Sequence, residues 1–162
     1  MRGTLTTRRV WSTAVLALGL LAAPQVVQAD VSSGVISAFR GQLVISKDEL
    51  PDGKNDKETI TKIKAVQLKE LLGTKNDDVV YWHFHYTAFL KQLGASALKL
   101  EFMNGTKLSA DQRLDGVDPK SNVLSGDISI NEDEGLAAGK TYTVQLVNAK
   151  DQVVATTTLV MK

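Results

Sequence analysis

Cysteine is missing from this 162-residue sequence, and its absence excludes several kinds of chemistry. Without cysteine the chain can form no disulfide, no thiol nucleophile and no cysteine-ligated metal site. A bacterial lipoprotein anchor also needs a cysteine just after its cleavage point, so we expect no lipid anchor. Histidine is nearly as scarce, with two residues, His83 and His85. Any chemistry that needs an imidazole is therefore confined to this pair.

Motifs that are typical of common enzymes are also missing. The sequence has no Gly-rich loop that could hold a phosphate and no Gly-x-Ser-x-Gly nucleophile motif. No pair of carboxylates stands in a recognisable glycosidase context. We therefore predict that the protein is not an enzyme. A small hydrolase that uses His83 or His85 with a carboxylate is the weakest of three hypotheses.

No strong excess of one charge is present. The sequence has 19 Lys and Arg residues against 18 Asp and Glu residues. Three of the basic residues lie in an N-terminal segment that we expect to be removed, which leaves a net charge of −2. Because binding to nucleic acid needs a basic stripe or patch, we predict no nucleic-acid partner.

The N-terminal 29 residues have the pattern of an export signal. Arg2, Arg8 and Arg9 give a positive start, the apolar run 10–23 follows, and Val27-Gln28-Ala29 matches a cleavage site with small residues. We predict a cleaved signal peptide at 1–29 and a periplasmic or extracellular protein. Ordinary secretion through the Sec pathway and the twin-arginine route, suggested by the adjacent Arg8 and Arg9, are the two alternatives.

After this segment, about 133 residues remain, which is enough for a single domain over 30–162. No later run approaches the roughly 18 apolar residues that span a bilayer, so we expect no membrane span after cleavage. Turn residues are frequent, and short runs rich in β-branched and aromatic residues lie between them. This spacing is typical of a β-sandwich or barrel.

Alternating apolar and polar residues locate the strands. The pattern predicts strands over 35–46 (interrupted at Gly41), 80–89, 98–102, 123–130, 142–146 and 153–161. The last two flank the short polar connection 148–152 and should form a hairpin. A three-residue loop over 103–105 would align the apolar residues on either side of Asn104-Gly105.

A helical stripe of apolar residues predicts one helix over 56–73. Asp56 is the expected N-cap, and Gly73 is the expected stop. The fold class that we predict is therefore mostly β, an antiparallel β-sandwich with one short helix near 57–72. We expect this helix to cover one edge or end of the sheets.

Five of the eight aromatic residues after position 29 fall between Tyr81 and Phe89. On a strand, Trp82, Phe84 and Tyr86 share one face, and the two histidines share the other face with Thr87. We predict that the aromatic face lies in the hydrophobic core, and the alternative is an exposed platform that stacks on a sugar or peptide. Burial of the Trp82 indole would reject the platform.

The His-x-His pair is a candidate metal site, because both imidazoles point to the same side of the strand. Zinc or copper could bind His83 and His85, with Asp77, Asp78 or Glu101 as a third ligand. Calcium could bind at two acidic loops, although neither matches the ligand spacing of an EF-hand. The loops contain Asp48, Glu49, Asp52, Asn55 and Asp56 in the first, and Asn131, Glu132, Asp133 and Glu134 in the second.

The segment Leu136-Ala-Ala-Gly139-Lys-Thr-Tyr142-Thr-Val144-Gln-Leu146 resembles the corner before the penultimate strand of an immunoglobulin-like or fibronectin-type sandwich. The resemblance implies that the Tyr142 hydroxyl hydrogen-bonds to the backbone a few residues upstream, after a turn at Gly139. It also implies that Trp82 is a core residue. The bridged cysteines of antibody domains are missing, and the predicted helix departs from a plain sandwich.

The whole chain after position 29 also resembles a group of small exported bacterial proteins, and this resemblance implies no activity. The residues that fit its outline are Trp82, Phe84, His85, Gly126, Asp127, Ile128, Glu132, Asp133, Gly135, Gly139, Thr141 and Tyr142.

Two functional hypotheses stand ahead of the hydrolase. The first is a non-enzymatic interaction or structural module whose partner is a protein or an envelope polymer. The second is a metal- or small-ligand-binding protein that uses the His83 and His85 face.

Overall fold

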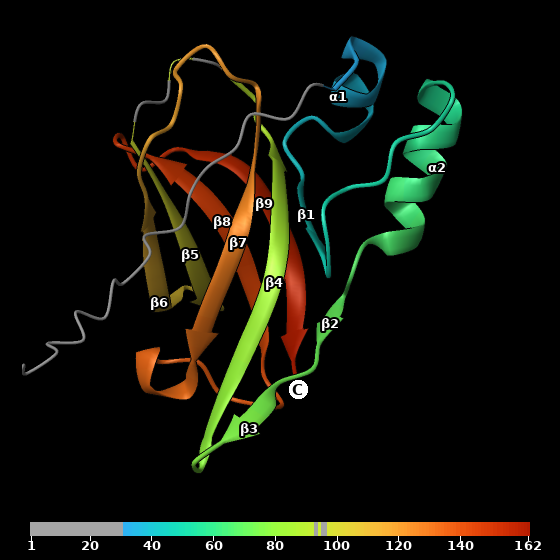
Figure 1. The fold of residues 1–162 in the computed structure, drawn as a ribbon. Helices are drawn as coiled ribbons and strands as arrows, with labels where there is room; N and C mark the ends of the chain where they lie inside the picture. Colours follow the sequence, from blue (N-terminus) through green and yellow to red (C-terminus); the bar gives the residue numbers. More distant parts are fainter. Residues whose placement is uncertain (1–30, 93, 95–96) are drawn as a thin grey trace, which may run out of the picture.

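The computed structural model describes residues 31–162 except 93, 95 and 96, and its chain forms two facing β-sheets with two helices at one side (Figure 1). The predicted mostly β fold is confirmed. The predicted signal peptide at 1–29 lies outside the described residues. Within the described part, no helix is long and apolar enough to cross a membrane. The elements in chain order are α1 (Ser33–Phe39), β1 (Leu43–Ser46), α2 (Asp56–Val66), β2 (Glu70–Leu71), β3 (Thr74–Asn76), β4 (Val79–Phe89), β5 (Leu98–Asn104), β6 (Lys107–Leu114), β7 (Val123–Asn131), the 3₁₀ turn η1 (Glu132–Glu134), β8 (Thr141–Asn148) and β9 (Val153–Met161).

The smaller sheet has four strands and is built around β4. Strand β7 pairs with nearly the whole length of β4 on one side, and β1 and β3 share the other side. The larger sheet has five strands in the order β2-β9-β8-β5-β6. Among the described strands the pairs are antiparallel, except for the short parallel contact between β2 and β9. We call these the four-stranded and five-stranded sheets.

The hydrophobic core lies between the two sheets. Trp82, Phe84 and Tyr86 of β4 are 0%, 3% and 0% exposed, so the predicted aromatic core face is confirmed and the exposed platform is rejected. Phe84 meets Phe102 of the five-stranded sheet edge to face, with ring centroids 6.4 Å apart. The indole Nε1 of Trp82 donates to the Lys162 carbonyl at 3.1 Å. Burial of these large rings provides a major part of the stabilisation of the sandwich.

A second, smaller core lies on the outer face of the four-stranded sheet. There the helices α1 and α2 cover one end of β4 and β7, and Phe39 of α1 stacks on Phe89 of β4 with centroids 5.1 Å apart. The predicted helix therefore covers part of a sheet, as expected. The buried members of this core are Val35, Phe39, Val44, Ile63, Phe89 and Val123.

The predicted opening strand over 35–46 is wrong in its first half. Residues 33–39 form α1, and only Leu43–Ser46 is a strand. Ser32 caps the helix, because its Oγ accepts a hydrogen bond from the Val35 amide. The spacing of four residues places Val35 and Phe39 on one helical face, and both are buried against the sheet. Tertiary packing therefore outweighs the β-propensity of this segment.

The predicted helix over 56–73 is present but ends early. Helix α2 spans Asp56–Val66, and its N-cap is Asn55, whose side chain accepts from the Glu58 amide at 3.0 Å. Beyond the helix, the Leu68 amide donates to the Ile45 carbonyl, and β2 pairs with β9. Segment 67–73 is extended because it obtains these hydrogen bonds from strands, a competition that helical periodicity does not reveal.

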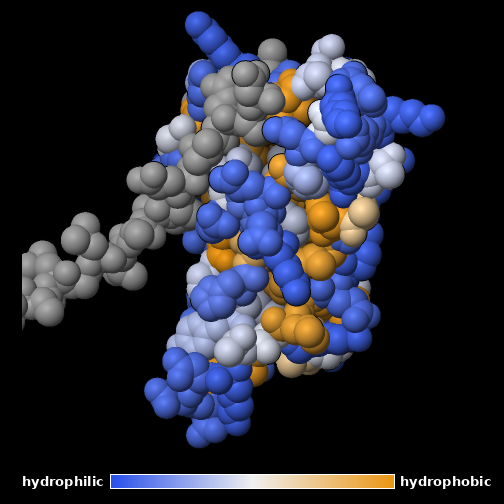
Figure 2. Space-filling model, turned by 45° about the vertical axis from the view of Figure 1, so that its right-hand side comes forward, coloured by the Kyte–Doolittle hydropathy of each residue, from blue (hydrophilic) through white to orange (hydrophobic). Residues whose placement is uncertain are grey.

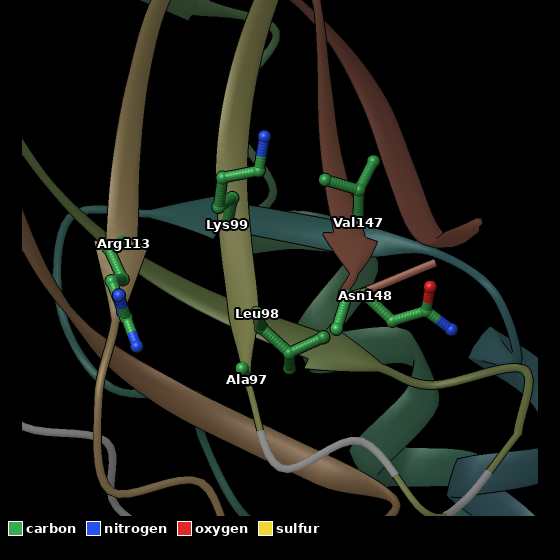
Figure 3. Close-up of a pocket in the computed structure, with 7 residues that line it drawn as sticks. Ala97, Leu98, Lys99, Arg113, Val147 and Asn148 are labelled. Carbon is green, nitrogen blue, oxygen red and sulfur yellow. The ribbon is translucent and has the colours of Figure 1, made fainter. Parts of the chain in front are cut away.

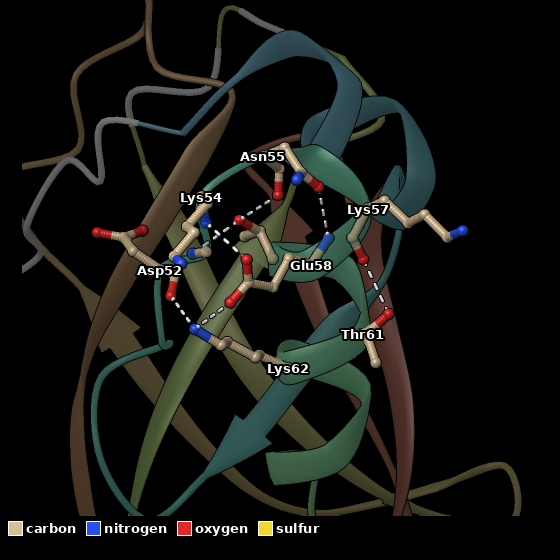
Figure 4. A network of polar contacts seen from close by, with 9 residues as sticks. Asp52, Lys54, Asn55, Lys57, Glu58, Thr61 and Lys62 are labelled. Atoms are coloured by element: carbon tan, nitrogen blue, oxygen red, sulfur yellow. Dashed lines mark hydrogen bonds and ion pairs between the residues drawn. The ribbon is translucent and has the colours of Figure 1, made fainter.

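Polar contacts hold the start of α2 (Figure 4). The Glu58 carboxylate accepts from the Lys54 amide at 3.1 Å and pairs with the Lys62 amine at 2.9 Å. The hydrogen bond from Lys62 is the main cause that lowers the pKa of Glu58. The Lys62 amine also donates to the Asp52 carbonyl at 2.9 Å. These contacts fix the loop before the helix to its first two turns.

The two hairpins of the five-stranded sheet differ in how well the sequence predicts them. The predicted connection 148–152 between β8 and β9 is confirmed. The predicted loop over 103–105 is wrong, because Asn104 pairs with Lys107 across a two-residue turn. A shift in register one residue further along then places Phe102 opposite Ala110. A β-bulge, and not the loop length, aligns the apolar residues.

The corner before β8 has the predicted geometry. The Tyr142 hydroxyl accepts a hydrogen bond from the Ala137 amide at 3.0 Å, and the Tyr142 side chain is buried. Gly139 has φ +77°, a conformation that a residue with a side chain rarely adopts, and its amide donates to the Met161 carbonyl at 2.8 Å. The corner therefore fixes the chain where it crosses from η1 to β8.

The surface on the side of α2 is divided between polar and apolar regions. Figure 2 brings this side forward and shows hydrophilic atoms over much of the upper part and an apolar strip below them. Among the described residues, Val66 at the end of α2 and Leu72 after β2 are large hydrophobic residues with exposed fractions of 39% and 78%. These two side chains are therefore open to solvent.

Candidate functional site

The outer face of the four-stranded sheet carries both histidines. Helices cover only one end of this face, so its exposure changes along β4: Phe89 is buried, His85 is 5% exposed, and His83 is exposed. The antiparallel register places His85 opposite Asp127 of β7 and His83 opposite Ser129. Four polar side chains from two neighbouring strands are thereby brought together on one face.

A hydrogen bond joins the two strands at the buried histidine. His85 Nδ1 lies 3.0 Å from Asp127 Oδ1, and the side chains of His85 and Asp127 are 6% and 86% exposed. An ionised carboxylate only accepts hydrogen bonds, so Nδ1 is the nitrogen that carries the proton in the neutral ring. The buried imidazole therefore holds one oxygen of a solvent-exposed carboxylate in a fixed position.

A hollow of about 430 Å³ lies beside this pair and extends toward the edge strand β6. Its size is in the range of small-ligand sites. Most of the side chains that line it are polar or charged, and the other two, Phe84 and Ile128, belong to the core. The residues that line it are Lys47, His83, Phe84, Gln112, Asp127, Ile128 and Ser129.

Tyr81 extends this polar region along β4. Its ring lies parallel to the His83 ring, with an angle of 5° between the planes and 6.4 Å between the centroids. We call Lys47, Tyr81, His83, Asp127 and Ser129 the His83 patch. The patch combines an ammonium group, an imidazole, a carboxylate, an aliphatic hydroxyl and a phenol, and its two flat rings are the imidazole and the phenol.

The carboxylates that the sequence suggested as third metal ligands lie elsewhere. Asp77 and Asp78 form the turn between β3 and β4, where Asp78 pairs with Lys75. Glu101 lies on the outer face of the five-stranded sheet and accepts from Lys99 and Gln145 at 2.9 and 3.0 Å. No group of three His, Asp or Glu side chains in the described part of the chain is arranged to hold a metal ion. Metal binding by the histidine pair stays a prediction.

The structure gives other partners to residues of the first acidic loop. Asn55 caps α2, and Asp56 accepts a hydrogen bond from Ser32 at 2.7 Å. The Asp52 carboxylate points away from Asn55 (Figure 4). The side-chain oxygens of Asn55 and Asp56 therefore accept hydrogen bonds at the helix start and from Ser32.

Residues of the second acidic loop are likewise used in local structure. Asn131 and Glu134 form a capping box around η1, in which each side chain accepts from a backbone amide of the other end of the turn. Glu132 accepts from the Val80 amide at 3.3 Å and thereby ties η1 to β4. Calcium binding at either loop stays a prediction.

A second hollow lies at one end of the five-stranded sheet (Figure 3). Lys99 and Arg113 stand beside it on neighbouring strands, and their charged ends point in different directions (Figure 3). Each cation already has a carboxylate partner: Lys99 pairs with Glu101 at 2.9 Å and Arg113 with Asp115 at 3.2 Å. Other lining residues are Ala97, Leu98, Val147, Asn148 and Ala149. This hollow offers fewer free polar groups than the His83 patch.

The hydroxyl of Ser129 stands near the histidines but makes no hydrogen bond with His83 or His85 among the described contacts. Nucleophilic catalysis needs a base within hydrogen-bond reach of the nucleophile and a third group that orients the base. The one oriented imidazole, His85, is buried and pairs with Asp127. Because no described contact gives Ser129 an oriented base, the side chains of the His83 patch are better suited to holding a polar ligand than to nucleophilic catalysis.

Sequence reasoning found the histidine pair but missed Asp127 and Lys47 as its neighbours. Alternation along β7 indicates which residues point outward, but it does not give the register between β7 and β4.

A scan against known protein families finds none that matches this chain, and a search of curated proteins finds no matching relative. The functional argument therefore depends on the geometry of the patch.

Proposed function

We propose that this protein is an exported, non-enzymatic binding module that holds a hydroxyl-rich glycan of the cell envelope or exterior at the His83 patch. The observation that carries the proposal is the hydrogen bond at 3.0 Å between buried His85 and exposed Asp127. It fixes a carboxylate beside His83 at the rim of the hollow before any ligand arrives. Such preorganisation lowers the entropy cost of binding.

The chemistry of the patch fits sugar hydroxyl groups. Asp127 accepts hydrogen bonds, Lys47 donates them, and the Ser129 hydroxyl and the His83 imidazole can do both. A sugar ring also has an apolar face that packs on flat side chains, and the parallel rings of Tyr81 and His83 offer such a surface. The mixed charges of the patch favour a neutral polyhydroxyl ligand over a strongly charged one.

The proposal includes the export of the chain and an immunoglobulin-like identity for the sandwich. The signal pattern at 1–29 supports export. The two sheets and the hydrogen bond from the Ala137 amide to the Tyr142 hydroxyl support the immunoglobulin-like identity. In folds of this kind, functional groups are often carried on sheet faces and loops of a rigid scaffold.

Binding to glycans tests the proposal. The purified chain is applied to an array of envelope and extracellular glycans and is co-sedimented with insoluble peptidoglycan. We expect one glycan class to bind, and we expect His83→Ala and Asp127→Ala each to weaken that binding by about tenfold, which is the loss of one good polar contact.

Thr158→Ala provides the matched control, because Thr158 is an exposed residue of β9 in the opposite sheet. This variant should bind as the unchanged chain does. Absence of binding to every glycan tested would contradict the proposal, and so would glycan binding that survives both substitutions in the patch. If the chain binds a protein and no glycan, the result favours an interaction module whose partner is a protein.

A further inference from the structure

The β6 strand is one edge of the five-stranded sheet, and the two-residue β2 is at the other. Strand β6 pairs with β5 on one side, and no other described strand pairs with it. An unpaired edge presents backbone N–H and C=O groups to any strand that can approach it. The eight residues Lys107–Leu114 form a long edge, so their side chains decide what can add to it.

Gln112, in the middle of this edge, has an unsatisfied buried group. Its side chain stands opposite Leu100 of β5, on the face of the strand that is directed toward the core. Its Oε1 atom is buried and accepts no hydrogen bond. A buried acceptor without a partner is costly, and an incoming donor at this position would remove the cost.

The charges along β6 are complementary to a second copy of the same strand in one antiparallel register. With a two-fold axis at Gln112, Asp111 lies opposite Arg113 of the second copy, and the symmetry repeats this ion pair. Arg113 pairs with Asp115 of its own chain through Nε, so the other guanidinium nitrogens can serve Asp111. The same register places Ala110 opposite Leu114 and sets the two Gln112 amides against each other. The amide nitrogen of one Gln112 can then donate to the unsatisfied oxygen of the other.

Neighbouring registers are unfavourable. An axis at Asp111 would set two carboxylates opposite each other, and an axis at Ala110 would set Lys107 opposite Arg113. A shift by a single residue would pair the core-facing side of one strand with the outer side of the other. The side chains thus select one alignment.

The chain around η1 limits the free edge to the residues that this register uses. A Cβ atom added at Gly135 would collide with the Ser109 carbonyl oxygen, so the residue after η1 lies directly against β6 at that point. The part of β6 beyond this contact is 110–114. These five residues are the ones that pair about Gln112.

Strand β7, the long edge strand of the four-stranded sheet, does not have this complementarity. Strand β7 contains Asp127 but no Lys or Arg over Val123–Asn131, so two copies of it cannot form a symmetric ion pair. Asp127 is also engaged by His85. The β6 and β7 edges therefore differ in the chemistry that a second strand would meet.

We propose that the chain forms a two-fold symmetric dimer through β6, in which the two five-stranded sheets join into one continuous sheet. Gln112 also borders the hollow of the His83 patch, so the dimer brings two hollows close to the axis. Two linked sites bind a repeating polymer more tightly than one. The dimer itself does not depend on the identity of the ligand.

Charge exchange tests this interface. The molar mass of the chain is measured by sedimentation equilibrium over a range of concentrations, with circular dichroism as a check of folding. Asp111→Arg and Arg113→Asp each place like charges opposite each other, and we expect each to weaken dimerisation by at least about tenfold. The double variant restores opposite charges in the same register and should restore the dimer.

Lys57→Glu in α2 is the control, since this residue is exposed and α2 lies on the side of the molecule opposite to β6 (Figure 1), and it should leave the dimer unchanged. A chain that stays monomeric at all accessible concentrations would overturn the proposal. A dimer that is unaffected by both single substitutions, or that the double variant does not restore, would also overturn it. Glycan binding by a monomer would still be consistent with the proposed function.

Discussion

The two faces of β4 have the same alternating pattern in the sequence but different surroundings in the fold. The face with Trp82, Phe84 and Tyr86 is buried between the sheets from Trp82 to Ala88. The face with His83 and His85 is covered by helices at one end and open at the other. Alternation alone thus identifies the two faces, whereas distant segments determine how much of the second face meets solvent.

Among the substitutions that test this comparison, Trp82→Ala should cause the largest loss of stability. The side chain is fully buried and its indole donates to the Lys162 carbonyl. We expect Trp82→Ala to lower the free energy of unfolding by about 3–5 kcal/mol, measured by urea denaturation. A loss below about 1 kcal/mol would show that this face is not tightly packed.

Tyr86 provides a finer test of the same face, because its buried hydroxyl has no hydrogen-bond partner. Tyr86→Phe removes this hydroxyl and should leave stability unchanged or raise it by about 1–2 kcal/mol. If the free energy of unfolding measured by urea denaturation falls by a similar amount instead, the hydroxyl has a hydrogen-bond partner.

The same substitution should alter the dependence of stability on alkaline pH. Burial is the main cause that raises the pKa of Tyr86, and the nearby charge of Asp127 adds to it. The folded state therefore resists ionisation of the phenol, and stability should fall as the pH rises above the unfolded value of about 10. In Tyr86→Phe this part of the decline should disappear, as measured by urea denaturation across that range.

On the other face, Asp127→Ala should have a moderate effect. The substitution leaves the buried Nδ1–H of His85 without its acceptor. Since Asp127 is largely exposed, we expect a loss of about 0.5–1 kcal/mol in urea denaturation. Asp127→Asn, which retains an acceptor, is the matched control and should lose less. Equal losses in the two variants would contradict the role given to this hydrogen bond.

His83→Ala should have the smallest effect on stability, within about 0.5 kcal/mol, because the side chain is exposed. The same variant tests the predicted metal site when equilibrium dialysis with zinc and copper is compared with the unchanged chain. Metal bound by the unchanged chain and lost in His83→Ala would support the histidine pair as ligands. Absence of binding at micromolar metal would reject it.

Strand positions could be predicted from the sequence because burial of one face imposes a period of two. The Tyr142 corner could be predicted because its residues are close together in the chain. Helix α1 could not, because its stability depends on Phe39 packing against Phe89, fifty residues further on. Asp127 was missed as the partner of His85 for a related reason, since only the β4–β7 register brings them together.

The most direct test of the account is the accessibility of the Trp82 indole to a quencher. The sequence has two tryptophans, and Trp11 lies in the predicted signal peptide, so the chain from position 30 onward reports on Trp82 alone. We expect blue-shifted fluorescence that acrylamide hardly quenches until the chain unfolds in urea. Emission of the native chain that is quenched as readily as that of the unfolded chain would contradict the buried face, and with it the arrangement that turns the histidines outward.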